Sequence, residues 1–203
     1  PRLKLRIVSE RHADGFLAGP DAYLAAARAN AGAREYRGNL MEPFVVTDCL
    51  IRRGLLVEAR SILTALSEVR DSHPGDDGRF LKVFETGIGL LRNAENLGQL
   101  KRLLTSEKKE TRLAAIEVTG WFGSDAAPIV IDLLRSADDK WVRKSVLRSL
   151  GLLGRDAIAP ALRILADPAE SWFMKRNLLG FVGENGGPTH AGPVAALAAH
   201  SHP

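Results

Sequence analysis

The chain has 203 residues, of which 45% are hydrophobic, 26% are charged and only 6% are aromatic. It is long enough to bury a substantial core, and its longest apolar runs are too short to cross a bilayer, which excludes a membrane-spanning helix. A net charge of +4, with 24 acidic residues interspersed among 28 basic ones, favours a mixed solvated surface over a dedicated nucleic-acid-binding stripe.

Cys49 is the only cysteine, so the chain can form neither an intramolecular disulfide nor a cysteine-based zinc site. Its apolar neighbours in Phe44–Leu50 predict a buried structural thiol rather than a reactive one. This cysteine usage favours a cytoplasmic location. The abrupt start at Pro1, without an initiator methionine, leads us to expect a segment of a larger bacterial-type protein.

Residues 1–41 are predicted to be an irregular N-terminal segment with one helix. The alternation of apolar and polar residues in Leu3–Ser9 is typical of a short strand. The alanine-rich segment Pro20–Asn30 predicts a helix, and Ala31–Asn39 predicts a loop.

Residues 42–95 are predicted to form degenerate helical hairpins. Gly54 separates two helical patterns, and the sequence around it resembles the turn of a tetratricopeptide repeat. Ser72–Gly78 has the composition of a loop. The expected helices, including the hairpin that leads into the next region, are Pro43–Arg53, Leu56–Arg70, Phe80–Arg92 and Leu97–Leu104.

An internal repeat occupies residues 96–203. The segments Thr111–Gly123, Val142–Gly154 and Met174–Gly186 align with spacings of 31 and 32 residues. In each copy a basic residue near the start and two glycines near the end coincide. The predicted copies are 96–125, 126–157 and 158–190, with a truncated copy at 191–203.

Each copy is predicted to be a helix, a tight turn and a second helix. Pro128, Pro160 and Pro193 open the first helices, where a missing N–H costs little. Glycines after the second helices suit the left-handed C′ position. A single hairpin cannot bury its apolar face alone, so stacked hairpins would share one continuous core.

The turn acid, the Val-Arg at the start of the second helix and the Leu-Gly-x-x-Gly that follows resemble HEAT repeats, of the short bacterial type also found in phycobilin lyases. This resemblance implies an all-α fold, a right-handed α-solenoid of stacked antiparallel hairpins. It also implies a structural ladder between turn acids and helix-start basic residues. The positions that match this ladder are Arg112, Asp139, Arg143 and Asp167, with Glu107, Glu110, Asp138, Glu170 and Lys175 as further members.

The sequence contains no motif that would mark an enzyme. It lacks a nucleophile elbow, a phosphate-binding loop and a His-Glu-x-x-His pattern, and no His-Glu dipeptide of the repeat-based iron hydroxylases occurs. We therefore expect no catalytic residues, no cofactor and no metal. A phycobilin lyase-like enzyme or a chaperone is a weaker alternative that rests on the repeat alone.

The expected function is a scaffold that binds a protein partner through the concave face lined by second helices. The basic residues expected on that face are Lys109, Lys144, Arg148, Lys175 and Arg176.

The alternative is a nucleic-acid-binding solenoid resembling some DNA glycosylases. Trp121, Trp141 and Trp172 could then stack on bases, with Glu117 as the catalytic carboxylate. The favoured interpretation instead treats Trp141 and Trp172 as plugs that pack one repeat on the next.

Overall fold

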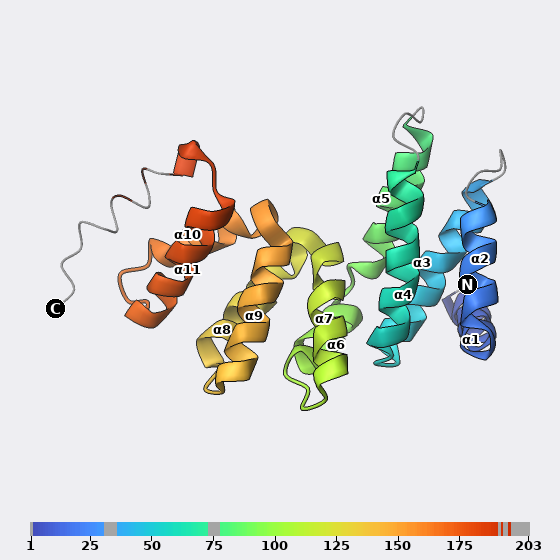
Figure 1. Ribbon diagram of the computed structural model, residues 1–203, viewed down its shortest axis with the longest axis horizontal. Helices are drawn as coiled ribbons and strands as arrows, with labels where there is room; N and C mark the ends of the chain where they lie inside the picture. Colours follow the sequence, from blue (N-terminus) through green and yellow to red (C-terminus); the bar gives the residue numbers. More distant parts are fainter. Residues whose placement is uncertain (1, 31–35, 73–77, 191, 193–194, 196–203) are drawn as a thin grey trace. The chain divides into compact units, whose positions relative to one another are not determined.

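The computed structural model describes residues 2–30, 36–72, 78–190, 192 and 195, and every regular element in these ranges is a helix (Figure 1). The expected all-α fold of helical hairpins is therefore confirmed. Contacts divide the chain into two compact units, Pro1–Val118 and Thr119–Pro203. Within the described ranges, no helix combines the length and the apolarity that a bilayer span requires.

The first unit is built around α3. Its helices are α1 (Arg2–Ala18), α2 (Pro20–Asn30), α3 (Tyr36–Arg52), α4 (Leu56–Asp71), α5 (Arg79–Leu91), α6 (Ala94–Leu104) and α7 (Lys109–Thr119). The α3 helix contacts α1, α2, α4, α5 and α6. Phe44 of α3 is fully buried and meets the ring of Phe84 edge-on, with centroids 5.1 Å apart. Gly87 of α5 lies directly against the Phe44 ring.

A partly buried polar cluster joins α3 to the start of α6. Asp48 Oδ1 accepts hydrogen bonds from the side-chain amides of Asn93 at 2.9 Å and Asn96 at 2.8 Å. Its other oxygen accepts from Arg52 at 3.0 Å. Asn96 is fully buried and also donates to the carbonyl of Leu91 at 2.9 Å. These bonds satisfy groups that would otherwise lose water without compensation.

The predicted N-terminal strand is wrong, because Leu3–Ser9 lies inside α1. A lone strand leaves its backbone groups unpaired, whereas a helix pairs them within the segment, and α1 packs against α3. The helix predicted from Pro43 begins earlier, at Tyr36, with Pro43 inside it. Pro20–Asn30 is a helix as predicted.

The turn at Gly54 is confirmed. Its φ is +77°, and the N–H groups of Gly54 and Leu55 donate to the carbonyls of Ile51 and Leu50 at 2.9 Å each. This is the Schellman arrangement, in which a glycine without a Cβ accepts the left-handed conformation that ends a helix. Some predicted segments lie outside the described residues. They are most of the loop Ser72–Gly78, residues 31–35 of the loop Ala31–Asn39, and most of the truncated copy at 191–203.

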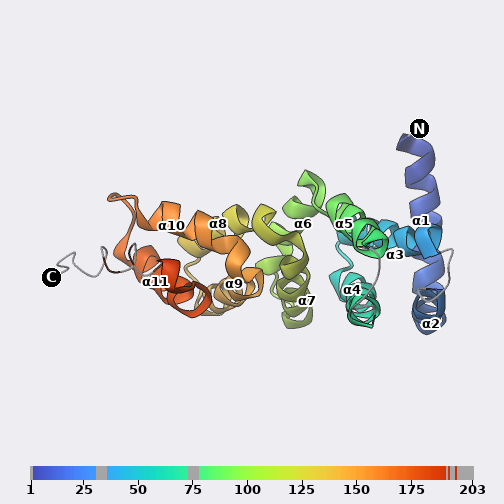
Figure 2. The same cartoon turned by 90° about the horizontal axis from the view of Figure 1, so that it is seen from above.

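The second unit consists of two stacked helical hairpins. They are formed by α8 (Ala127–Ser136) with α9 (Lys140–Leu153) and by α10 (Ile158–Leu165) with α11 (Trp172–Asn185). First helix contacts first helix, and second helix contacts second helix. Figure 2 shows α8 and α10 on one side of this unit and α9 and α11 on the other. The 3-10 helices η1 (Gly120–Asp125), η2 (Gly154–Ala157) and η3 (Pro188–His190) complete the unit.

The turns explain why the repeat folds this way. Asp139 caps α9, its carboxylate accepting from the N–H groups of Trp141 at 2.7 Å and Val142 at 3.0 Å. Gly123 and Gly154 have positive φ values of 55° and 53°, as expected, although their ψ values of −140° and −127° lie outside the left-handed helical region. Gly186 has a φ of −80°, so the prediction of a left-handed residue is wrong there.

Candidate functional site: the outward face of α9 and α11

The α9 helix is amphipathic, and its solvent side is basic. Lys140, Lys144 and Arg148 follow one another at intervals of four residues, and all three are exposed. This spacing places them in one row along the helix. Trp141 is 64% exposed and Leu152 is 47% exposed, so large apolar side chains accompany the charges. The opposite side, with Val146, Leu150 and Leu153, is buried and packs into the hairpin.

The α11 helix repeats this arrangement one hairpin later. Trp172 is 43% exposed, and Arg176, one turn further, is also exposed. Gly180 continues the same row and is exposed, with no atom within 4 Å of the position that a Cβ would take. The buried side of α11 is formed by Met174, Leu178, Phe181 and Val182.

One contact between the two helices fixes their register. The guanidinium carbon of Arg143 on α9 lies 5.5 Å from the ring centroid of Phe173 on α11. Packed helices have axes about 8–10 Å apart, so the two exposed rows are neighbours. We call this surface the α9–α11 face, formed by Lys140, Trp141, Lys144, Arg148, Leu152, Trp172, Arg176 and Gly180.

An ion pair holds the turn that precedes α11. Arg135, at the end of α8, donates to Glu170 Oε2 from Nε at 3.1 Å and from Nη2 at 2.7 Å. The hydrogen bond from Arg135 lowers the pKa of the Glu170 carboxyl, and the N–H of Ser171 adds to this effect. The same hydrogen bond raises the pKa of Arg135. The pair therefore stabilises the entry into α11.

Three of the five basic residues predicted to bind a partner, namely Lys144, Arg148 and Arg176, are exposed on the α9–α11 face. Lys175 is only half-exposed, and its ammonium donates to the carbonyl of Pro168 at 3.3 Å. Lys109 is exposed in the first turn of α7 and belongs to the first unit.

The residues predicted to form an acid–base ladder make other contacts. Arg112 donates to the carbonyls of Ser106 and Glu107, and Asp139 is the cap of α9. Asp167 accepts from the N–H of Ala169 at 2.9 Å, and Arg143 stacks on Phe173. Over the described residues, these side chains bind backbone groups and an aromatic ring in place of the expected carboxylate partners.

The structure also bears on the interpretations given to the tryptophans and to Glu117. Trp141 is 64% exposed, which argues against its predicted role as a plug between repeats, whereas Trp172 is 43% exposed and more than half of its surface is covered. Glu117, the carboxylate considered for a glycosylase, lies 3.7 Å from the guanidinium of Arg60 within the first unit. Nothing in the sequence indicated directly that the tryptophans would be exposed. The row of like charges in α9 could be recognised from the four-residue spacing of its members.

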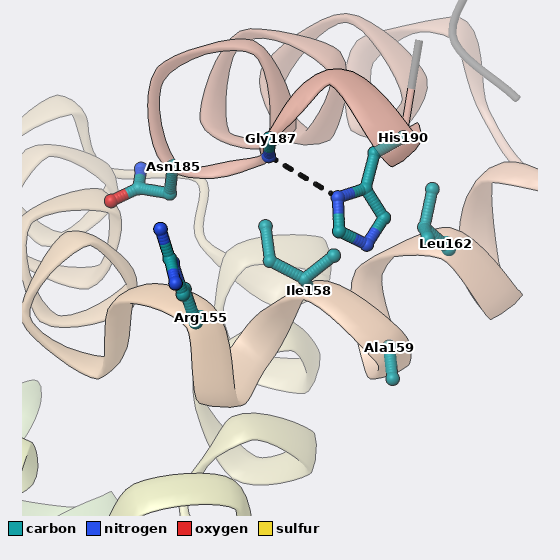
Figure 3. Close-up of a pocket in the computed structure, with 7 residues that line it drawn as sticks. All are labelled: Arg155, Ile158, Ala159, Leu162, Asn185, Gly187 and His190. Atoms are coloured by element: carbon teal, nitrogen blue, oxygen red, sulfur yellow. Dashed lines mark hydrogen bonds between the residues drawn. The ribbon is translucent and has the colours of Figure 1, made fainter. Parts of the chain in front are cut away.

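A hollow of about 350 Å³ lies between α10 and the end of α11. Figure 3 shows its lining residues, which are Arg155, Ile158, Ala159, Leu162, Asn185, Gly187 and His190. His190 Nδ1 accepts a hydrogen bond from the N–H of Gly187 at 3.3 Å. Asn185 donates to the carbonyl of Phe181 at 3.0 Å. The described lining residues include no acid, thiol or hydroxyl, so they offer no nucleophile–base pair. Across the described part of the chain, no three His, Cys, Asp or Glu side chains form a metal-ligand group.

Residues 85–151 match the family model for HEAT repeats, a stretch that runs from α5 through most of α9. The resemblance to phycobilin lyases receives no support from this match. A search of curated proteins found no significant match.

Proposed function

We propose that this chain, which matches HEAT repeats over residues 85–151, is a non-catalytic scaffold that binds a protein partner through the α9–α11 face. Stacked helical hairpins commonly present the surface of one helix layer to a partner. The single observation that supports this choice of surface is the exposure of Trp141 and Trp172 beside Lys144, Arg148 and Arg176.

Exposed tryptophans and arginines are the side chains that contribute most to protein interfaces. They supply a large contact area, and both combine apolar surface with polar groups. The exposed part of an indole leaves apolar surface in water, and its burial against a partner removes that surface from water. The same surface carries no pair of groups suited to acid–base or nucleophilic chemistry, which is why we propose a binding role. A cytoplasmic location stays a prediction from cysteine usage.

Photo-crosslinking tests this proposal directly. A photoreactive phenylalanine analogue replaces Leu152 on the α9–α11 face, and the matched control carries it at Arg163, which is exposed on α10. Adducts with a defined protein should form from position 152 and be much weaker from position 163. The triple variant Lys144→Glu, Arg148→Glu, Arg176→Glu should lose these adducts while keeping its helical circular dichroism spectrum.

Two results would contradict the proposal. Equal adducts from both positions would show that the α9–α11 face is not distinguished from the rest of the surface. Adducts formed mainly with nucleic acid would favour the alternative function, a nucleic-acid-binding solenoid. The affinity of the chain for DNA would then fall steeply as the salt concentration rises.

A further inference from the structure

Within the part of the chain that the structure describes, the basic side chains of the α9–α11 face have no acidic partner. The side chains of Lys144, Arg148 and Arg176 form no hydrogen bond or ion pair with any described residue. The α9 sequence contains no acidic residue, and α11 contains only Glu184, near its end. Asp139, the acid next to α9, already accepts two backbone hydrogen bonds.

The spacing of these charges also destabilises the α9 helix. Lys140, Lys144 and Arg148 are successive i, i+4 neighbours, and like charges at this spacing destabilise a helix. Lys140 additionally lies in the first helical turn, where the helix dipole disfavours a cation. Since this row has no ion-pair partner among the described residues, it is suited to bind an anionic group outside the chain.

Apolar side chains define the rest of the surface. Trp141 stands beside the basic row near its start, and Leu152 continues the row at its other end. On α11, Trp172 and Arg176 are followed by Gly180, where the absence of a side chain leaves the helix backbone accessible to a close neighbour. A ligand that covers this face must therefore combine acidic groups with apolar ones.

We propose that the α9–α11 face binds a short acidic segment of a protein, whose carboxylates pair with Lys144, Arg148 and Arg176 and whose apolar residues cover Trp141 and Trp172. This inference rests on the proposed function and adds the chemical class of the partner. The row from Lys140 to Arg148 is about 12 Å long, which matches about two turns of a partner helix.

Acidic residues limit the length of the bound segment. Asp138 precedes α9 and Glu184 lies near the end of α11, and both are exposed. The phosphate backbone of a long nucleic acid would extend beyond the basic row and meet these carboxylates. A short peptide can place its own acids on the row alone, so charge complementarity favours an acidic peptide over nucleic acid.

The test uses a phage-displayed library of random 16-residue peptides, selected on the full chain. Peptides that still bind the variant Trp141→Ala, Trp172→Ala are removed by counter-selection. The enriched peptides should carry several Asp or Glu residues with one or two large apolar residues. Their binding should quench or shift the tryptophan fluorescence, and Lys144→Glu, Arg148→Glu should weaken it at least 10-fold. The matched control Arg163→Glu should bind as the unmodified chain does.

A charge-exchange experiment tests whether binding depends on opposite charges on the peptide and on the chain. A peptide in which lysines replace the acids should bind the Lys144→Glu, Arg148→Glu variant better than the unmodified chain. Enrichment of neutral or basic peptides, or of none, would overturn the inference. Tighter binding of a 20-nucleotide single-stranded DNA or of vesicles containing anionic lipid would also overturn it. If crosslinking from position 152 captures a protein through a non-acidic segment, the inference fails while the proposed function stands. If neither experiment detects a protein or peptide, both fail.

Discussion

Replacing Gly87 by alanine should destabilise the first unit, although the same change usually stabilises a helix. Gly87 lies inside α5, and a Cβ there would overlap three atoms of the Phe44 ring. That ring is fully buried and is held by the edge of Phe84. Overpacking of a core costs about 1–3 kcal/mol. Alanine gains up to about 1 kcal/mol over glycine in a helix, so we expect a net loss of roughly 1–2 kcal/mol.

Gly89 provides the matched control in the same helix. It is exposed, and no atom lies within 4 Å of the position that a Cβ would take there. Gly89→Ala should therefore be stabilising, by about 0.5 kcal/mol because it lies near the end of α5. Urea denaturation of both variants measures the two effects as opposite shifts of the midpoint with an unchanged slope.

A double-mutant cycle identifies the cause of the loss. Phe44→Leu removes part of the ring that the new methyl group would meet, so Gly87→Ala should cost less in that background. Equal stability of Gly87→Ala and Gly89→Ala would show that the Phe44 ring does not oppose a Cβ at position 87. Simple additivity of the changes at Phe44 and Gly87 would show the same.

Three further predictions concern charge and buried polarity. The pKa of Glu170 is lowered by Arg135, so the stability lost in Glu170→Gln should be present near neutral pH and disappear as the pH falls through that lowered pKa. Denaturation measured across a pH series checks this, and a difference that persists in strong acid would contradict it. Asn96→Ala should cost about 1–3 kcal/mol, because Asp48 loses a donor inside the fold. A urea midpoint equal to that of the unmodified chain would argue against this role. Lys140→Glu should raise the thermal midpoint, since an acid in the first turn of α9 suits the helix dipole and is worth about 0.3–1 kcal/mol. A lower midpoint would show that Lys140 has a stabilising contact in the fold.

Much of the fold could be predicted from the sequence because the signals are local. The second helices begin at Lys109, Lys140 and Trp172, which reproduces the spacings of 31 and 32 residues found in the sequence. Helical periodicity, an acidic cap such as Asp139 and a breaking glycine such as Gly54 act over a few residues. Their effect therefore does not depend on what packs against them.

Tertiary structure alone decided the remaining features. Leu3–Ser9 alternates like a strand, yet it is helical because the first unit offers α1 a helix to pack on and the described chain offers no strand to pair with. Lys175 and Arg176 are adjacent in sequence, but the first reaches a backbone carbonyl while the second stays exposed.

At the candidate site, too, the sequence did not predict which side of a helix is buried. A spacing of 31 residues places Trp141 and Trp172 at equivalent points of two repeats, but it does not say which side of each helix the neighbouring hairpin covers. The packing of α8 against α9 and of α10 against α11 settles that question and leaves both indoles partly exposed to solvent. The sequence by itself therefore determined the helices and their repeat. The stacking of the hairpins decided which of their residues are available to a partner, because burial depends on neighbours that are distant along the chain.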